Sequence, residues 1–94
     1  MKTVKDAMII FGQWGFEYQD TGGGHDAFAR RLDDGKAYVM VTDTDGHAPE
    51  RDGQNLLIGF YADDDDDGEY GEATSFEDAL ATANRLIADH YTGG

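Results

Sequence analysis

The sequence predicts an α+β fold: a helix, a four-stranded antiparallel meander sheet and a second helix, with both helices packed on one face of the sheet. Apolar residues recur at helical spacing near both ends of the chain, whereas the middle is rich in β-branched and aromatic residues between glycine-containing turns. Sequential strands joined by short connections form a meander. Two amphipathic helices bury their apolar stripes most simply on the same face.

The size of the chain predicts a single domain over residues 1–94. It has 94 residues, of which 39% are hydrophobic, so one modest core is expected. Because the sequence contains no cysteine, disulfides and thiolate metal sites are excluded.

The first helix is predicted over residues 4–14, and Gly15 is placed to end it. The apolar residues at helical spacing are Val4, Ala7, Met8, Phe11 and Trp14. We expect Trp14 to be a core residue or to pack at the end of the helix.

The four strands are predicted over residues 16–19, 25–32, 36–43 and 55–62. Glycines 22–24 favour a wide turn or loop after the first strand, and residues 44–54 favour a loop before the fourth. Gly59 marks either a bulge or a close crossing of a helix.

The third predicted strand is apolar on both sides. Ala37, Val39 and Val41 share one side, whereas Tyr38, Met40 and Thr42 share the other. If the helices cover one face, the other is an exposed apolar face, which is a candidate contact surface or the seam of a homodimer.

An acidic segment separates the last strand from the second helix. Asp63 to Asp67 are consecutive, and Glu69 and Glu72 follow without a basic residue. Like charges this close repel one another, so residues 63–74 are predicted to be a solvated loop. A Thr74 or Ser75 cap then begins the second helix. Its apolar stripe consists of Phe76, Ala79, Leu80, Ala83, Leu86, Ile87 and Tyr91.

The net charge of −13 is concentrated in one part of the chain. Residues 1–32 hold four acidic and four basic residues, whereas residues 33–94 hold sixteen acidic and three basic residues. Such a charge repels nucleic acid and anionic membranes and attracts basic protein surfaces. We therefore expect a cytoplasmic protein that binds neither nucleic acid nor a membrane directly.

The sequence does not predict an enzyme or a resident cofactor. Ser75 is the only serine, and a helix cap accounts for it. His25, His47 and His90 share no ligand spacing. Twenty acidic residues offer carboxylate pairs by chance, so no acid–base pair can be identified.

One acidic pattern indicates weak calcium binding. Asp63, Asp65, Asp67 and Gly68 reproduce the D-x-D-x-D-G opening of an EF-hand loop. The twelfth position holds Thr74 instead of a glutamate, and a strand is predicted before the loop. Weak binding by the three aspartates is therefore favoured over a dedicated calcium sensor.

Part of the chain resembles a group of phage and prophage proteins. The pieces that carry the resemblance are TGGG at 21–24, FARRLDDGKAYVMVTD at 28–43, DG at 45–46 with Pro49, and LLIGFYADD at 56–64. In this order they look like small acidic phage or prophage proteins of unassigned function, over about residues 14–64. The resemblance implies a similar fold and a mobile-element origin, and it transfers no catalytic residue.

The leading hypothesis is a phage-encoded acidic protein that mimics nucleic acid and inhibits a host nucleic-acid-binding system of the anti-restriction or anti-CRISPR type. Carboxylates on one face of a strand lie roughly 6.6–6.8 Å apart and can occupy a groove meant for phosphates. The expected partner-binding residues are Asp43, Asp45, Asp63, Asp64, Asp65, Asp66, Asp67, Glu69 and Glu72. The alternative is an acidic soluble domain of a salt-adapted or high-GC organism, with weak calcium binding at the aspartate loop.

Overall fold

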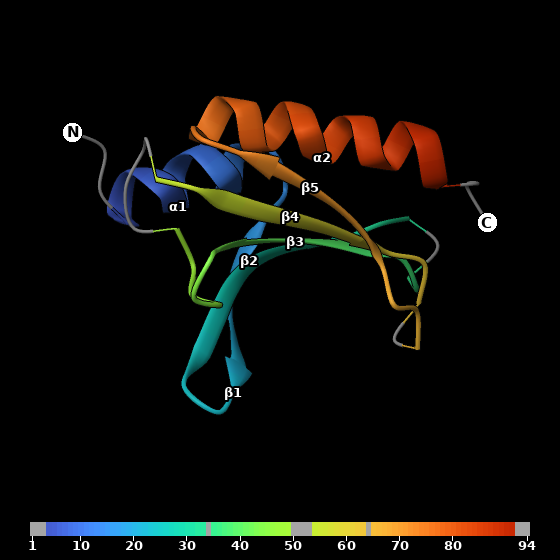
Figure 1. Cartoon of the computed structure of the whole chain (residues 1–94), viewed down its shortest axis with the longest axis horizontal. Helices are drawn as coiled ribbons and strands as arrows, with labels where there is room; N and C mark the ends of the chain where they lie inside the picture. Colours follow the sequence, from blue (N-terminus) through green and yellow to red (C-terminus); the bar gives the residue numbers. More distant parts are fainter. Residues whose placement is uncertain (1–3, 34, 50–53, 64, 92–94) are drawn as a thin grey trace.

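The computed structural model describes residues 4–33, 35–49, 54–63 and 65–91. Its elements are α1 (Val4–Gln13), β1 (Glu17–Gly22), β2 (His25–Arg31), β3 (Tyr38–Asp43), β4 (Leu56–Tyr61), β5 (Glu69–Ala73) and α2 (Phe76–His90). The strands form one antiparallel sheet in chain order, β1 to β5. Both helices lie on the same side of this sheet (Figure 1). The predicted α+β class is confirmed.

The sheet has five strands, and the prediction of four was wrong. The additional strand, β5, lies inside the segment 63–74 that was predicted to be a loop, and it pairs with β4 from Glu69 opposite Phe60 to Ala73 opposite Leu56. Charge repulsion does not prevent this pairing because the consecutive aspartates lie before the strand. Within β5, alternation sends Glu69 and Glu72 to opposite faces of the sheet, which separates their carboxylates.

The β1–β2 hairpin is longer and tighter than predicted. β1 extends through Gly22, so only Gly23 and Gly24 form the turn. Both residues have positive φ angles, 62° and 83°, which glycine adopts without the steric penalty of a Cβ. In Figure 1 this hairpin bends away from the side that carries the helices.

The face of the sheet under the helices consists of hydrocarbon side chains. The strand residues Phe28, Val39, Val41, Ile58 and Phe60 are at most 2% exposed. Phe11 of α1 stacks on Phe28 with ring centroids 5.0 Å apart, and it meets Phe76 of α2 edge to face at 5.5 Å. Both helices therefore join the same core.

Helix α2 follows the sequence prediction closely. Ser75 is its N-cap, and the Ser75 hydroxyl oxygen accepts a hydrogen bond of 3.0 Å from the Asp78 backbone N–H. The predicted apolar stripe is buried or half-buried along the whole helix. Among the described residues, no helix combines the length and the apolar character needed to cross a membrane.

Helix α1 buries a narrower stripe than predicted. Phe11 is fully buried and Ile10 half-buried, but Met8, Ile9 and Trp14 are 48%, 56% and 50% exposed. Met8, although it is part of the predicted apolar stripe, is therefore not in the core. Trp14 is not in the core either, and of its two predicted positions only the end of the helix remains, because it directly follows Gln13. Residues 8–11 are all apolar, so helical periodicity does not select which side of this short helix faces inward.

The close crossing of a helix over the sheet occurs at Gly71 rather than at Gly59. A Cβ on Gly71 would lie 2.6 Å from Cγ2 of Thr82 in α2. At Gly59 the strand register is regular, and a Cβ would instead lie 2.9 Å from the Tyr61 ring on the opposite face. The predicted bulge or helix crossing at Gly59 was therefore wrong.

Candidate functional site

The face of the sheet opposite the helices, hereafter the open face, carries three tyrosines among other polar and apolar side chains. Strand alternation and register place on it Arg31, Tyr38, Met40, Thr42, Leu57, Gly59, Tyr61, Tyr70 and Glu72. Tyr38, Met40 and Thr42 are half-buried, as expected for a sheet face without a covering layer. Their placement confirms that alternate residues of β3 face the two sides of the sheet.

Three tyrosines, Tyr38, Tyr61 and Tyr70, form a continuous group that we call the tyrosine row. The Tyr38 and Tyr61 rings stack with centroids 4.9 Å apart, and Tyr70 meets Tyr61 edge to face at 5.9 Å. At one end of the row, Cζ of Arg31 lies 5.3 Å from the centroid of the Tyr38 ring. This distance is within the range of a cation–π interaction.

Two glycines make room for Tyr61 at the centre of the row. A Cβ on Gly59 would lie 2.9 Å from the Tyr61 ring, and a Cβ on Gly68 would lie 2.6 Å from it. Burial, with a smaller contribution from the hydrogen bond to Tyr70, raises the pKa of Tyr61 well above its ordinary value. Tyr61 therefore stays a neutral phenol that can donate a hydrogen bond.

Residues 62, 63 and 65–68, which we call the acidic turn, lie between β4 and β5, and two of their carboxylates hold the backbone of the turn. Asp63 Oδ1 accepts a hydrogen bond of 2.9 Å from the Asp65 backbone N–H, and Asp66 Oδ2 accepts one of 2.9 Å from the Ala62 N–H. Backbone N–H groups, led by that of Ala62, hold the pKa of Asp66 below its ordinary value. Asp65 and Asp67 are exposed, and Asp64 lies outside the described residues.

Tyr70 joins the tyrosine row to the acidic turn. Its hydroxyl donates a hydrogen bond of 2.9 Å to the Asp67 carbonyl oxygen and accepts one of 3.0 Å from the Tyr61 hydroxyl. The Tyr70 side chain is nevertheless 52% exposed. The two features are therefore parts of one surface, at the end of the sheet where β4 leaves it.

The structure does not gather the other predicted acidic residues at this place. Asp43 ends β3 opposite Leu56, at the other end of β4 from the acidic turn. Its carboxylate accepts hydrogen bonds of 2.9 and 3.0 Å from the N–H groups of Asp45 and His47, so Asp43 shapes its own loop. Glu72 shares the open face, whereas Glu69 points to the side of the sheet that carries the helices.

The calcium pattern is not assembled as a cage in this conformation. Within the described residues, which exclude Asp64, no three histidine, aspartate or glutamate side chains are placed together so that they could hold a metal ion. The Asp63 carboxylate is turned toward the backbone of the turn.

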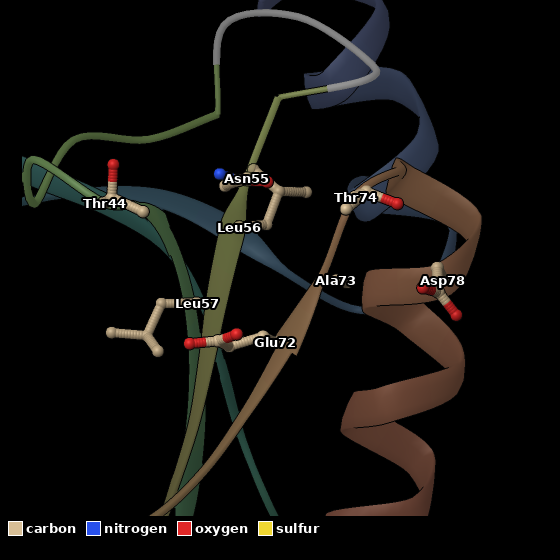
Figure 2. A pocket seen from close by; sticks show the side chains of 8 residues that line it. All are labelled: Thr44, Asn55, Leu56, Leu57, Glu72, Ala73, Thr74 and Asp78. Carbon is tan, nitrogen blue, oxygen red and sulfur yellow. The ribbon is translucent and has the colours of Figure 1, made fainter.

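A pocket of about 450 Å³ opens where β4 and β5 meet the N-terminal end of α2. Its lining residues are Thr44, Asn55, Leu56, Leu57, Glu72, Ala73, Thr74 and Asp78. Figure 2 shows the Glu72 side chain extending toward Leu57, whereas Asp78 lies on α2, on the other side of β5. The two carboxylates do not converge, so the pocket does not form a paired-carboxylate site.

A polar cluster around Asp26 ties the β1–β2 hairpin to the loop after β3. The carboxylate accepts hydrogen bonds from the Tyr18 hydroxyl at 2.5 Å and from the Ala48 N–H at 2.9 Å, and His47 Nδ1 lies 3.2 Å away. The bond from Tyr18 is the largest cause that lowers the pKa of Asp26, and the same bond raises the pKa of Tyr18. His25 lies beside His47, with ring centroids 5.8 Å apart.

Sequence reasoning found Tyr38 but missed its partners. Tyr61 lies in the predicted fourth strand, and placing it on the open face required the register between β3 and β4. Tyr70 could be placed only after β5 was recognised, and alternation through Glu69, Tyr70 and Gly71 was the available signal. The contacts of Asp26 with His47 and Ala48 join residues 21 and 22 positions apart, which no local pattern reveals.

Comparison of the chain with protein-family models, with curated proteins and with solved structures finds no match.

Proposed function

We propose that this chain is a non-enzymatic module that binds a basic surface of another protein through the open face and the acidic turn. The observation that carries the proposal is the hydrogen bond of 2.9 Å from the Tyr70 hydroxyl to the Asp67 carbonyl, which makes the tyrosine row and the acidic turn one surface. Tyrosine rings attract cationic side chains and their apolar stems, and carboxylates attract their charge. The combination fits lysine and arginine side chains.

The charge distribution supports a basic partner. The net charge of −13 arises within residues 33–94, which include three strands of the sheet and the acidic turn. Complementary charge raises the rate of association with a basic surface and disfavours acidic competitors. The same charge opposes direct contact with nucleic acid.

Within this class, we propose that the partner is a host protein whose basic groove normally holds nucleic acid, and that the chain is a mobile-element inhibitor of that protein. Asp65 and Asp67 are exposed in the acidic turn that Tyr70 joins to the tyrosine row, so the surface offers the partner negative charge and aromatic rings together. A basic groove that releases counterions when it binds phosphates would release them for carboxylates too. The resemblance to phage proteins supports this choice of partner.

A second candidate is an acidic domain whose charge serves solubility alone. The observation in its favour is that Asp63 and Asp66 use their carboxylates to hold the acidic turn together. These residues then have a structural role that requires no partner. In this case, no basic probe should distinguish the open face from any other acidic surface of the chain.

The test is a matched pair of double variants that remove the same charge, one pair from the acidic turn and the other from α2. Asp65→Asn with Asp67→Asn neutralises the acidic turn, and Glu77→Gln with Asp89→Asn neutralises two exposed positions on α2. The probe is a fluorescent octapeptide of alternating lysine and arginine, followed by anisotropy over a range of salt concentrations. We expect the first variant to lose several-fold more affinity than the second and to show a shallower dependence on salt. Equal losses would mean that only the overall charge attracts the peptide.

A further inference from the structure

The exposed end of the tyrosine row is shaped to receive a planar cation. Tyr70 is held by two hydrogen bonds at its hydroxyl, one with Tyr61 and one with Asp67, and its ring stands at 85° to the Tyr61 ring. The side chain is 52% exposed despite these restraints. A ring that is fixed before binding loses little conformational entropy when a ligand stacks on it.

The other end of the row shows which side chain these rings accept. Arg31 of the same chain lies over the Tyr38 ring at 5.3 Å, and its Nη1 donates to the Gly35 carbonyl at 3.2 Å. A guanidinium can stack on a ring and hydrogen-bond at its edge at the same time, because its donors lie in the plane of the group. Among the described residues, no arginine or lysine side chain lies over the ring of Tyr70.

Acidic residues precede and follow Tyr70 along the chain. Asp67 is joined to it through the backbone carbonyl, and Glu72 lies two residues further along β5 on the same face. Same-face neighbours on a strand are roughly 6.6–6.8 Å apart, so Glu72 is the nearest acidic residue to Tyr70 on this face of β5. Its carboxylate is the group with which a cation stacked on Tyr70 would pair.

We infer that Tyr70 and Glu72 form a subsite for an arginine side chain of the basic partner, with the guanidinium stacked on Tyr70 and paired with Glu72. This inference rests on the proposed function and adds a preference for arginine over lysine. The guanidinium is planar and less strongly hydrated than an ammonium group, so it gains more from stacking on a ring. A lysine ammonium group would bind this surface mainly through its charge.

The experiment compares octa-arginine with octa-lysine, two peptides of equal charge and length, at one salt concentration. We expect the protein to bind octa-arginine about two- to five-fold more tightly, the ratio that a cation–π contribution of about 0.5–1 kcal/mol gives. Tyr70→Leu should remove this preference, because it should weaken the binding of octa-arginine more than the binding of octa-lysine. Tyr70→Phe, which keeps the ring, should retain most of the preference.

Trp14→Leu is the matched control, because Trp14 is an equally exposed aromatic residue that directly follows α1 and lies outside the tyrosine row. It should leave the ratio between the peptides unchanged. Equal binding of the two peptides, or a preference that survives Tyr70→Leu, would overturn the arginine subsite while leaving the basic-partner proposal intact. Binding of neither peptide would overturn both.

Discussion

The two faces of the sheet have different chemistry although their residues alternate along the same strands. On the covered face, Val39 and Phe60 are almost fully buried under the helices. On the open face, their neighbours Tyr38 and Tyr61 stack on each other and are half-buried. The comparison shows that adjacent residues of one strand have different surroundings. One set is enclosed in the core, and the other is half-buried on the face that the helices do not cover.

The largest expected effect is a loss of stability, and we expect it to differ between substitutions on the two faces of the sheet. Phe28 is 1% exposed and stacks on Phe11 under the helices, so Phe28→Ala should lower the free energy of unfolding by about 3–5 kcal/mol. Met40→Ala, at a half-buried position of the open face, should lower the free energy of unfolding by about 1 kcal/mol or less, because removal of this side chain leaves no enclosed cavity. Urea denaturation monitored by circular dichroism measures both. Similar losses would mean that the open face is packed as tightly as the covered one.

The next effect concerns the closest approach of α2 to the covered face. Gly71→Ala should destabilise the protein by about 1–3 kcal/mol, because the new Cβ would lie 2.6 Å from Cγ2 of Thr82. Thr82→Ser removes that methyl group and keeps the hydroxyl. The double variant should therefore recover most of the lost stability in the same denaturation experiment. If Thr82→Ser gives no recovery, the clash at this crossing does not limit how α2 packs on β5.

The smallest of these effects on stability lies at Asp26, where hydrogen bonds rather than hydrocarbon hold the hairpin to its neighbouring loop. The Tyr18 hydroxyl and the Ala48 N–H lower the pKa of Asp26 below its ordinary 3.8. A lowered folded-state pKa stabilises the fold at pH values above the ordinary pKa, and this stabilisation is lost as the pH falls through the folded value. Asp26→Asn should therefore cost about 1–2 kcal/mol at neutral pH.

The pH dependence of this loss is the sharper measurement. The difference in stability between wild type and Asp26→Asn should begin to narrow below about pH 4, where the unfolded-state carboxylate becomes protonated, and should close as the pH falls through the lowered folded-state pKa. Asp45→Asn, at an exposed position of the same loop, should not differ comparably from wild type in stability at neutral or at acidic pH. A difference that is constant down to pH 3 would assign the effect to packing rather than to the ionised carboxylate.

Local patterns in the sequence predicted most of the fold. Helical spacing located α2 and its Ser75 cap, and β-branched residues located β3 and β4. The error at β5 arose because the charge of Asp63 to Asp67 was extended to the residues after it, where Tyr70 and Gly71 are compatible with a strand beneath a helix. The aspartates were correctly predicted to lie outside a strand, but the predicted loop was extended too far along the chain.

The candidate site was less predictable, because it depends on register and on long-range contacts. The sequence indicated the open face through Tyr38 and the acidic turn through its aspartates. It did not indicate that Tyr70 would connect the two, since that contact requires β5 to pair with β4 in the observed register. Nor did it indicate that the Asp63 and Asp66 carboxylates would be directed to the backbone of their own turn.

The most direct test of the open face as the binding surface uses the methionine methyl groups as reporters. Met40 lies on the open face beside Tyr38, whereas Met8 is 48% exposed on α1, on the side of the sheet that carries the helices. In methyl NMR spectra of methionine-labelled protein titrated with octa-arginine, we expect the Met40 signal to shift in proportion to binding and the Met8 signal to stay in place. A shift of Met8 with an unchanged Met40 would contradict the assignment and place the basic ligand on the helices.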